Sequence, residues 1–246
     1  MSAFWALCRR QLAAYFYAPL AYAVLTVFLA VAGLSFCRLI TQSLEENLNA
    51  SDLLFGSMYF WFMVLVAITL ISMPLFAEEK RSGTLESLLT APVTDLQVVM
   101  AKFSAAFLFF FSMTLPLLAY VALLPLCSTS LSGLYLLPVV TGYLLLLLMG
   151  AFFIAFGLWI SALTRSQVVA AILSFTGLSL FFFVDSLQYL GGGRSWALTL
   201  DYISSVQHMV DFGQGIVDTR PLVLYLSGVA FFLFAAVKAI ESRQWR

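Results

Sequence analysis

The sequence predicts an all-α membrane protein with six transmembrane helices. Of its 246 residues, 63% are hydrophobic and only 10% are charged, and the mean hydropathy is +1.01. Soluble domains carry about 25% charged residues, so this composition argues against a soluble enzyme. The formal net charge is zero, with twelve Lys and Arg residues against twelve Asp and Glu residues. That balance argues against a nucleic-acid partner.

Long uncharged stretches divide the chain into six spans. A hydrocarbon core about 30 Å thick requires about 20 apolar residues in a helix. The stretch between Lys102 and Arg165 encloses 62 uncharged residues, enough for two helices, and a turn-like segment at 127–133 interrupts it. The predicted spans, in a single domain over residues 1–246, are about 19–38, 53–76, 97–125, 134–162, 167–186 and 221–239.

Lys and Arg residues are distributed unevenly between the two sets of connecting loops. With the N-terminus inside the cell, Arg38, Arg194 and Arg220 fall outside. The other basic residues fall inside: Arg9, Arg10, Lys80, Arg81, Lys102, Arg165, Lys238, Arg243 and Arg246. Because cytoplasmic loops carry an excess of basic residues, we expect both termini in the cytoplasm.

The N-terminal segment allows two interpretations. Arg9 and Arg10 followed by an apolar run and Ala30-Val31-Ala32 are typical of a cleaved signal peptide. The apolar run continues to Cys37, however, which is longer than a signal peptide requires. We therefore expect a short interfacial helix over residues 3–16, with its arginines facing anionic lipid.

Residues 77–94 form the one long loop on the predicted inner side, and they contain signals for a short helix. Gly83 permits a sharp turn out of the preceding span. Thr84 is the expected N-cap, with Glu86 in the positively polarised first turn. Pro92 ends the helix because the residue before a proline avoids helical geometry.

This short helix is amphipathic. Leu85, Leu88 and Leu89 form one apolar stripe, and Thr94 with Gln97 forms a capping box that begins the next helix. Two hypotheses follow from the stripe. The helix is either a connector that lies on lipid or a docking element that fits into a groove of a partner protein.

The same loop carries a resemblance to a known family. The run 78–92 reads acidic-acidic-basic-x-x-Gly-Thr-Leu-Glu-x-Leu-Leu-x-x-Pro and resembles the cytoplasmic loop of type-2 ABC transporter permeases. More narrowly, it is similar to the gliding-motility-associated branch, with the permease of nitrous oxide reductase maturation as a near relative. Segments 163–175, 208–215 and 239–245 also resemble that branch.

The resemblance implies a division of labour between subunits. The loop helix of this chain would be a coupling helix that contacts a separate ATPase subunit. That ATPase would be present in two copies and would bind ATP and Mg. The resemblance also implies two further partners: a second permease subunit, in a homo- or heterodimer, and an auxiliary membrane protein with an extracytoplasmic domain. It implies export as the direction of transport and the bacterial cytoplasmic membrane as the location. The implied ATPase-coupling residues are Glu78, Glu79, Gly83, Thr84, Leu85, Glu86, Leu88 and Leu89.

Catalytic motifs are missing from the sequence. A P-loop needs a lysine directly after a glycine, and none of the three lysines has one. The single histidine excludes a site built from two histidines of this chain. We therefore expect no enzyme activity and no cofactor in this chain. The alternative function is an ATP-independent secondary carrier or channel, which should show paired ionisable groups within the membrane or broken helices in matching halves; neither is evident in the sequence.

Three ionisable residues near the predicted outer surface bear on that alternative. His208 and Asp211 are interpreted as a solvated or interfacial pair. Asp185 follows 19 uncharged residues and is expected to cap the end of a span. The outer segment 187–220 has apolar residues at helical spacing beyond 191–193, which predicts one or two helices at the outer leaflet, either a re-entrant gate or a simple lid.

Small residues recur in the fourth predicted span. Ala151 and Ala155 are four residues apart, as are Gly157 and Ser161. This spacing places small side chains on one helix face and predicts a close contact with a neighbouring helix.

Overall fold

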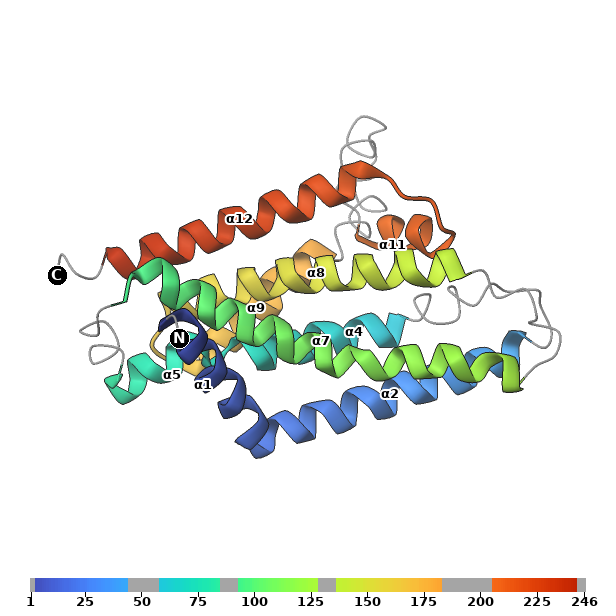
Figure 1. Ribbon diagram of the computed structural model, residues 1–246, viewed down its shortest axis with the longest axis horizontal. Helices are drawn as coiled ribbons and strands as arrows, with labels where there is room; N and C mark the ends of the chain where they lie inside the picture. Colours follow the sequence, from blue (N-terminus) through green and yellow to red (C-terminus); the bar gives the residue numbers. More distant parts are fainter. Residues whose placement is uncertain (1–2, 44–57, 85–92, 128–135, 183–204, 243–246) are drawn as a thin grey trace.

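A computed structural model describes residues 3–43, 58–84, 93–127, 136–182 and 205–242, and every regular element in these ranges is a helix (Figure 1). In chain order the helices are α1 (Ala3–Tyr17), α2 (Pro19–Ser43), α4 (Met58–Ser72), α5 (Pro74–Ser82), α7 (Asp95–Cys127), α8 (Leu136–Leu163), α9 (Gln167–Phe182), α11 (Ser205–Gly213) and α12 (Thr219–Glu241).

Within the described ranges, five segments are long and apolar enough to cross a membrane. They are Pro19–Cys37, Tyr59–Ser82, Asp95–Tyr120, Leu137–Leu163 and Thr219–Glu241. The chain is therefore a multi-pass membrane protein. The fifth span predicted from the sequence, 167–186, corresponds to α9, which has 16 described residues, and 183–186 lie outside the description. A count of six spans remains a prediction.

The long helices run back and forth along one axis (Figure 1). α2, α7 and α9 begin at the end where α5 lies, whereas α8 and α12 finish there. We call this end of the bundle, with α1 beside it, the α5 end. α11 lies at the opposite end (Figure 1).

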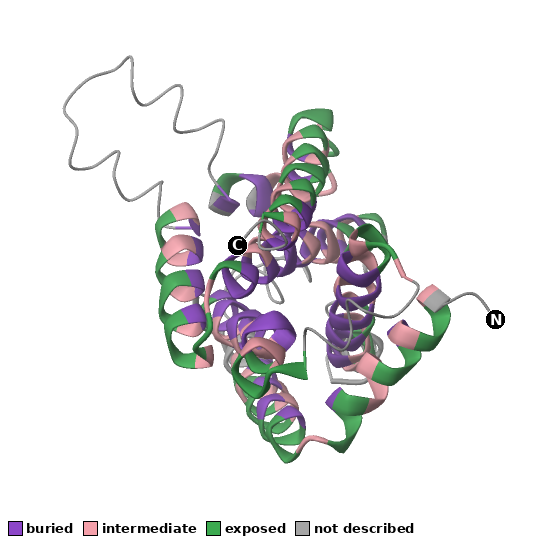
Figure 2. Cartoon of the chain, turned by 90° about the vertical axis from the view of Figure 1, so that its left-hand side faces the viewer, coloured by how far each residue is buried: buried purple, intermediate pink, exposed green. Residues whose placement is uncertain are grey.

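α8 is the central helix of the bundle, in contact with α4, α5, α7, α9, α11 and α12. Its buried residues include Leu146, Phe153 and Leu158. Figure 2 looks along the bundle from the α5 end and shows buried residues turned inward and exposed residues turned outward. The outward set includes large apolar side chains such as Phe231 and Phe234 on α12, as a lipid-facing surface requires.

Close helix contacts depend on glycine. The contact at Gly157 was predicted from the small-residue spacing in the fourth predicted span, 134–162. A Cβ atom at Gly157 of α8 would lie 2.2 Å from Ser72 Oγ of α4. At Gly228 of α12 it would lie 2.3 Å from the Phe152 ring of α8. Because lipid provides no hydrophobic drive for association, such backbone approach contributes directly to packing between membrane helices.

α11 is held to the bundle by buried polar contacts. Thr141 Oγ1 of α8 donates to the Phe212 carbonyl at 2.7 Å, and His208 Nδ1 lies 3.3 Å from the Tyr225 hydroxyl of α12. The interpretation of His208 as solvated is wrong, because it is only 7% exposed. Its ring packs edge-on against Tyr225, a partner that the spacing to Asp211 does not reveal. Asp185 lies outside the described residues.

Replacing Gly157 with alanine should destabilise the bundle. The new methyl group would overlap the Ser72 side chain, and overpacking of this kind costs about 1–3 kcal/mol. Thermal unfolding of the purified protein in detergent, followed by tryptophan fluorescence, measures the effect. Gly33→Ala is the control, since its nearest neighbour is the end of the Tyr120 side chain at 3.2 Å. Equal unfolding temperatures for G157A and the wild type would contradict this account.

Candidate coupling site

The second predicted span, 53–76, is divided by a break between α4 and α5. α4 ends at Ser72, and α5 begins at Pro74 after a turn at Met73. Proline has no backbone N–H and its ring clashes with the carbonyl four residues earlier, so a helix bends or ends there. The sequence analysis counted one continuous span and did not use this signal.

Backbone groups around the break are bound by side chains from other helices. The Ser161 hydroxyl of α8 accepts hydrogen bonds from the N–H groups of Phe76 (3.0 Å) and Ala77 (3.1 Å). The same hydroxyl donates to the Met73 carbonyl at 2.9 Å. The Tyr15 hydroxyl of α1 donates to the Ile71 carbonyl at 2.7 Å. Since unpaired backbone groups inside a membrane are costly, the hydrogen bonds of these hydroxyls stabilise the break.

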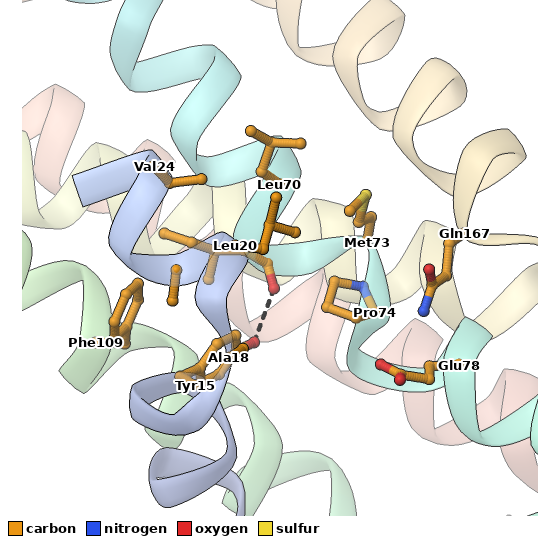
Figure 3. Close-up of a pocket in the computed structure, with 12 residues that line it drawn as sticks. Tyr15, Ala18, Leu20, Val24, Leu70, Met73, Pro74, Glu78, Phe109 and Gln167 are labelled. Atoms are coloured by element: carbon orange, nitrogen blue, oxygen red, sulfur yellow. Dashed lines mark hydrogen bonds between the residues drawn. The ribbon is translucent and has the colours of Figure 1, made fainter. Parts of the chain in front are cut away.

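Tyr15 is suited to this donor role. Its side chain is buried, and burial raises the pKa of the phenol far above its usual range, so the hydroxyl keeps its proton. Figure 3 shows this bond at the edge of a cavity of about 240 Å³ between the α1–α2 elbow and the break. Glu78 and Gln167 lie on one side of that cavity and Phe109 on the other (Figure 3).

A buried ion pair attaches α5 to α7. Lys102 of α7 is 4% exposed, and its ammonium lies 2.7 Å from Glu79 Oε1 of α5. The same ammonium donates to the Leu75 carbonyl at 2.6 Å and lies 5.0 Å from the centre of the Phe76 ring. Arg10 of α1 approaches the same carboxylate oxygen at 3.8 Å. A buried charge requires such partners, because desolvation otherwise disfavours it strongly.

The predicted coupling residues separate into inward and outward groups. Glu79 pairs with Lys102 of the same chain, a contact that was not predicted from the sequence. Lys80 donates to the Ala162 carbonyl at the end of α8. Glu78 and Thr84 are exposed. Gly83 ends α5 with a φ of 72°, which confirms the sharp turn expected there. Four of the predicted residues lie outside the described residues: Leu85, Glu86, Leu88 and Leu89.

The far end of the loop is also structurally defined. The Thr94 N–H donates to Gln97 Oε1 and the Gln97 N–H donates to Thr94 Oγ1, both at 3.3 Å. This reciprocal pair is the predicted capping box, and it begins α7. Segment 84–94 therefore starts at the end of α5 and finishes at the start of α7, the two helices that the Glu79–Lys102 pair joins.

Together these features define a multi-pass membrane protein with a helix break and a buried ion pair at one end of the bundle. The chain belongs to the ABC-2 family transporter proteins, because that family's model matches residues 10–182. Permeases of this family are membrane components of ABC transporters and normally partner with an ABC ATPase subunit. Comparison with curated proteins gives no match.

Replacing Lys102 with methionine should destabilise the protein by about 3–5 kcal/mol, because it leaves Glu79 partly buried without its main partner. The double variant E79Q/K102M should recover part of this loss. Chemical denaturation in detergent gives the coupling energy from the four proteins of the cycle.

The matched control is Lys238→Met. Lys238 pairs with Glu241 at 2.6 Å, but its side chain is 57% exposed, so we expect a loss of less than about 1 kcal/mol. A Lys102 variant as mild as this control would show that the buried pair does not hold α5 in place.

Proposed function

We propose that this chain is the permease subunit of an ATP-driven type-2 ABC exporter. The observation that carries the proposal is the placement of segment 84–94, together with the family match. The segment lies between the turn at Gly83 and the capping box at Thr94, and both of its ends belong to helices joined by a buried ion pair. A force applied to the segment would therefore act on α5 and α7 together.

The α5 end is the cytoplasmic end in this proposal. Arg10 belongs to α1, which lies at that end, and Lys80, Lys102, Arg165 and Lys238 belong to helix ends or turns there. Arg220 lies at the opposite end, at the start of α12. Basic residues concentrate on the cytoplasmic side of membrane proteins. This orientation places both termini of the chain in the cytoplasm and the coupling segment within reach of a cytoplasmic ATPase.

ATP binding and hydrolysis take place on the partner subunit, and this chain converts the resulting movement into a change in the bundle. The leucine stripe at 85, 88 and 89 fits into a groove of the ATPase, and the exposed Glu78 carboxylate faces its basic groups. Glu79 holds α5 to α7, so that a displaced loop moves α5 as a unit. The transport step is alternating access by rigid-body rearrangement.

The complete transporter would contain two ATPases and two permease subunits in a bacterial cytoplasmic membrane. Similarity of segments 78–92, 163–175, 208–215 and 239–245 to the gliding-motility and nitrous-oxide-reductase-maturation branch supports an auxiliary membrane protein with an extracytoplasmic domain. The outer segment 187–220, of which α11 is the described helix, would then form the outer gate.

Replacing both Leu85 and Leu88 with aspartate should separate the permease from its ATPase. Placing charge in a buried apolar contact costs more than 1.4 kcal/mol, so we expect more than about a tenfold loss of ATPase on the tagged permease. The measurement is affinity purification from the native host, with the P-loop ATPase quantified by mass spectrometry.

Leu163→Asp is the control, since Leu163 is an exposed leucine at the same end of the bundle but outside the loop. Unchanged recovery of the ATPase with the double aspartate variant would contradict the proposed coupling helix. Cargo movement by this chain alone in vesicles without nucleotide would instead favour a secondary carrier or channel.

A further inference from the structure

The Ser161 hydroxyl occupies an unusual position within the hydrogen bonding of α5. It donates to the Met73 carbonyl and accepts from the Ala77 N–H, two groups that are four residues apart. In a continuous α-helix these two groups would bond to each other. The hydroxyl of α8 is therefore inserted between natural partners, and an inserted side chain of this kind bends a helix.

A second arrangement would satisfy the same groups. If α5 moved away from α8, the N–H groups of Ala77 and Phe76, both now bound to Ser161, could bond directly to the carbonyls four residues earlier, those of Met73 and Ser72. The Ser161 hydroxyl could then donate to the carbonyl of Gly157, one turn earlier in its own helix. Ser174 of α9 already does this, donating to the Ala170 carbonyl at 2.6 Å. Because neither arrangement strands a buried polar group, the two differ little in hydrogen-bond energy.

The surroundings of the break allow α5 to move relative to α8. α5 is attached to α7 by the Glu79–Lys102 ion pair, which Arg10 of α1 approaches at 3.8 Å, while its closest packing is against α8. The cavity of about 240 Å³ is lined by Met73 and Pro74 and adjoins the break. The close contact between α4 and α8 lies just before the break, where Gly157 meets Ser72, and provides a fixed point for the movement.

We propose that Ser161 is a positioning residue, a latch that sets the angle of α5 and releases it when the ATPase subunits move the coupling segment. The latched state is the one in this structure, with the hydroxyl inserted at Met73 and Ala77. In the released state α5 closes its own hydrogen bond and follows the loop. This inference rests on the proposed function, since it requires a partner that moves the loop.

The test measures the position of α5 in the complete complex. Spin labels at Arg81 of α5 and Arg165 of the α8–α9 turn, both exposed, are introduced as cysteines in a variant without Cys37 and Cys127. Distance distributions are recorded in nanodiscs by double electron–electron resonance, without nucleotide and with Mg and a non-hydrolysable ATP analogue. We expect two populations whose ratio changes when the nucleotide is added.

Ser161→Ala should favour the released population by about threefold or more without nucleotide. The latched state loses three hydrogen bonds and is left with unpaired backbone groups, whereas the released state loses one bond within α8. Recovery of the ATPase should not change. Ser174→Ala is the matched control, a buried serine whose hydroxyl bonds only within its own helix in this structure, and it should keep the wild-type ratio. If S161A does not yield monodisperse complex, Ser161→Gly, which also lacks the hydroxyl and adds no labelling site, replaces it, with the same direction of shift.

Different outcomes overturn different parts of the account. A wild-type complex whose distances respond to nucleotide, with S161A responding identically, overturns the latch and leaves the permease function standing. A wild type that recovers no ATPase or shows no response to nucleotide overturns the proposed function and the latch with it.

Discussion

The arrangement of the α5 end depends on the N–H group that Pro74 lacks. A membrane helix normally satisfies its backbone groups internally, and a proline in its interior prevents this. The hydroxyls of Tyr15 and Ser161, on neighbouring helices, bind other backbone groups beside the break, namely the carbonyls of Ile71 and Met73 and the N–H groups of Phe76 and Ala77. Since a buried polar group without a partner costs about 1–3 kcal/mol, the break can persist only where those hydroxyls lie. Tyr15 of α1 therefore binds the last turn of α4, and Ser161 of α8 binds the start of α5.

A second constraint comes from the burial of Lys102. Its ammonium needs an anion and further acceptors, and α5 supplies the carboxylate of Glu79 and the carbonyl of Leu75. The contact joins the last turns of the helix that leads into segment 84–94 to the first turns of the helix that leaves it. The two ends of the segment are thus linked through this ion pair.

The sequence predicted those features that depend on local spacing. Length and apolar composition predicted a helical membrane protein, and the turn at Gly83 and the capping box at Thr94 and Gln97 occur where their local patterns indicate. Features that depend on distant partners were missed. The count of uncharged residues used Lys102 only as a charge that limits an apolar stretch. It did not predict that the Lys102 side chain is buried and paired with Glu79. His208 was interpreted together with Asp211, three positions further along one helix, whereas Tyr225 of another helix packs against it.

The contacts of α5 also differ in how readily they can be exchanged. Separating Glu79 from Lys102 would leave a buried charge without its partner, so the contact with α7 resists sliding. On the α8 side, Lys80 is bound to the Ala162 carbonyl, and its flexible ammonium lies at the end of the bundle, where water can replace that acceptor. The Ser161 hydroxyl has an acceptor available one turn earlier in its own helix. The hydrogen bonds between α5 and α8 are therefore more readily exchanged than the ion pair between α5 and α7, and a force on the loop would be expected to break them first.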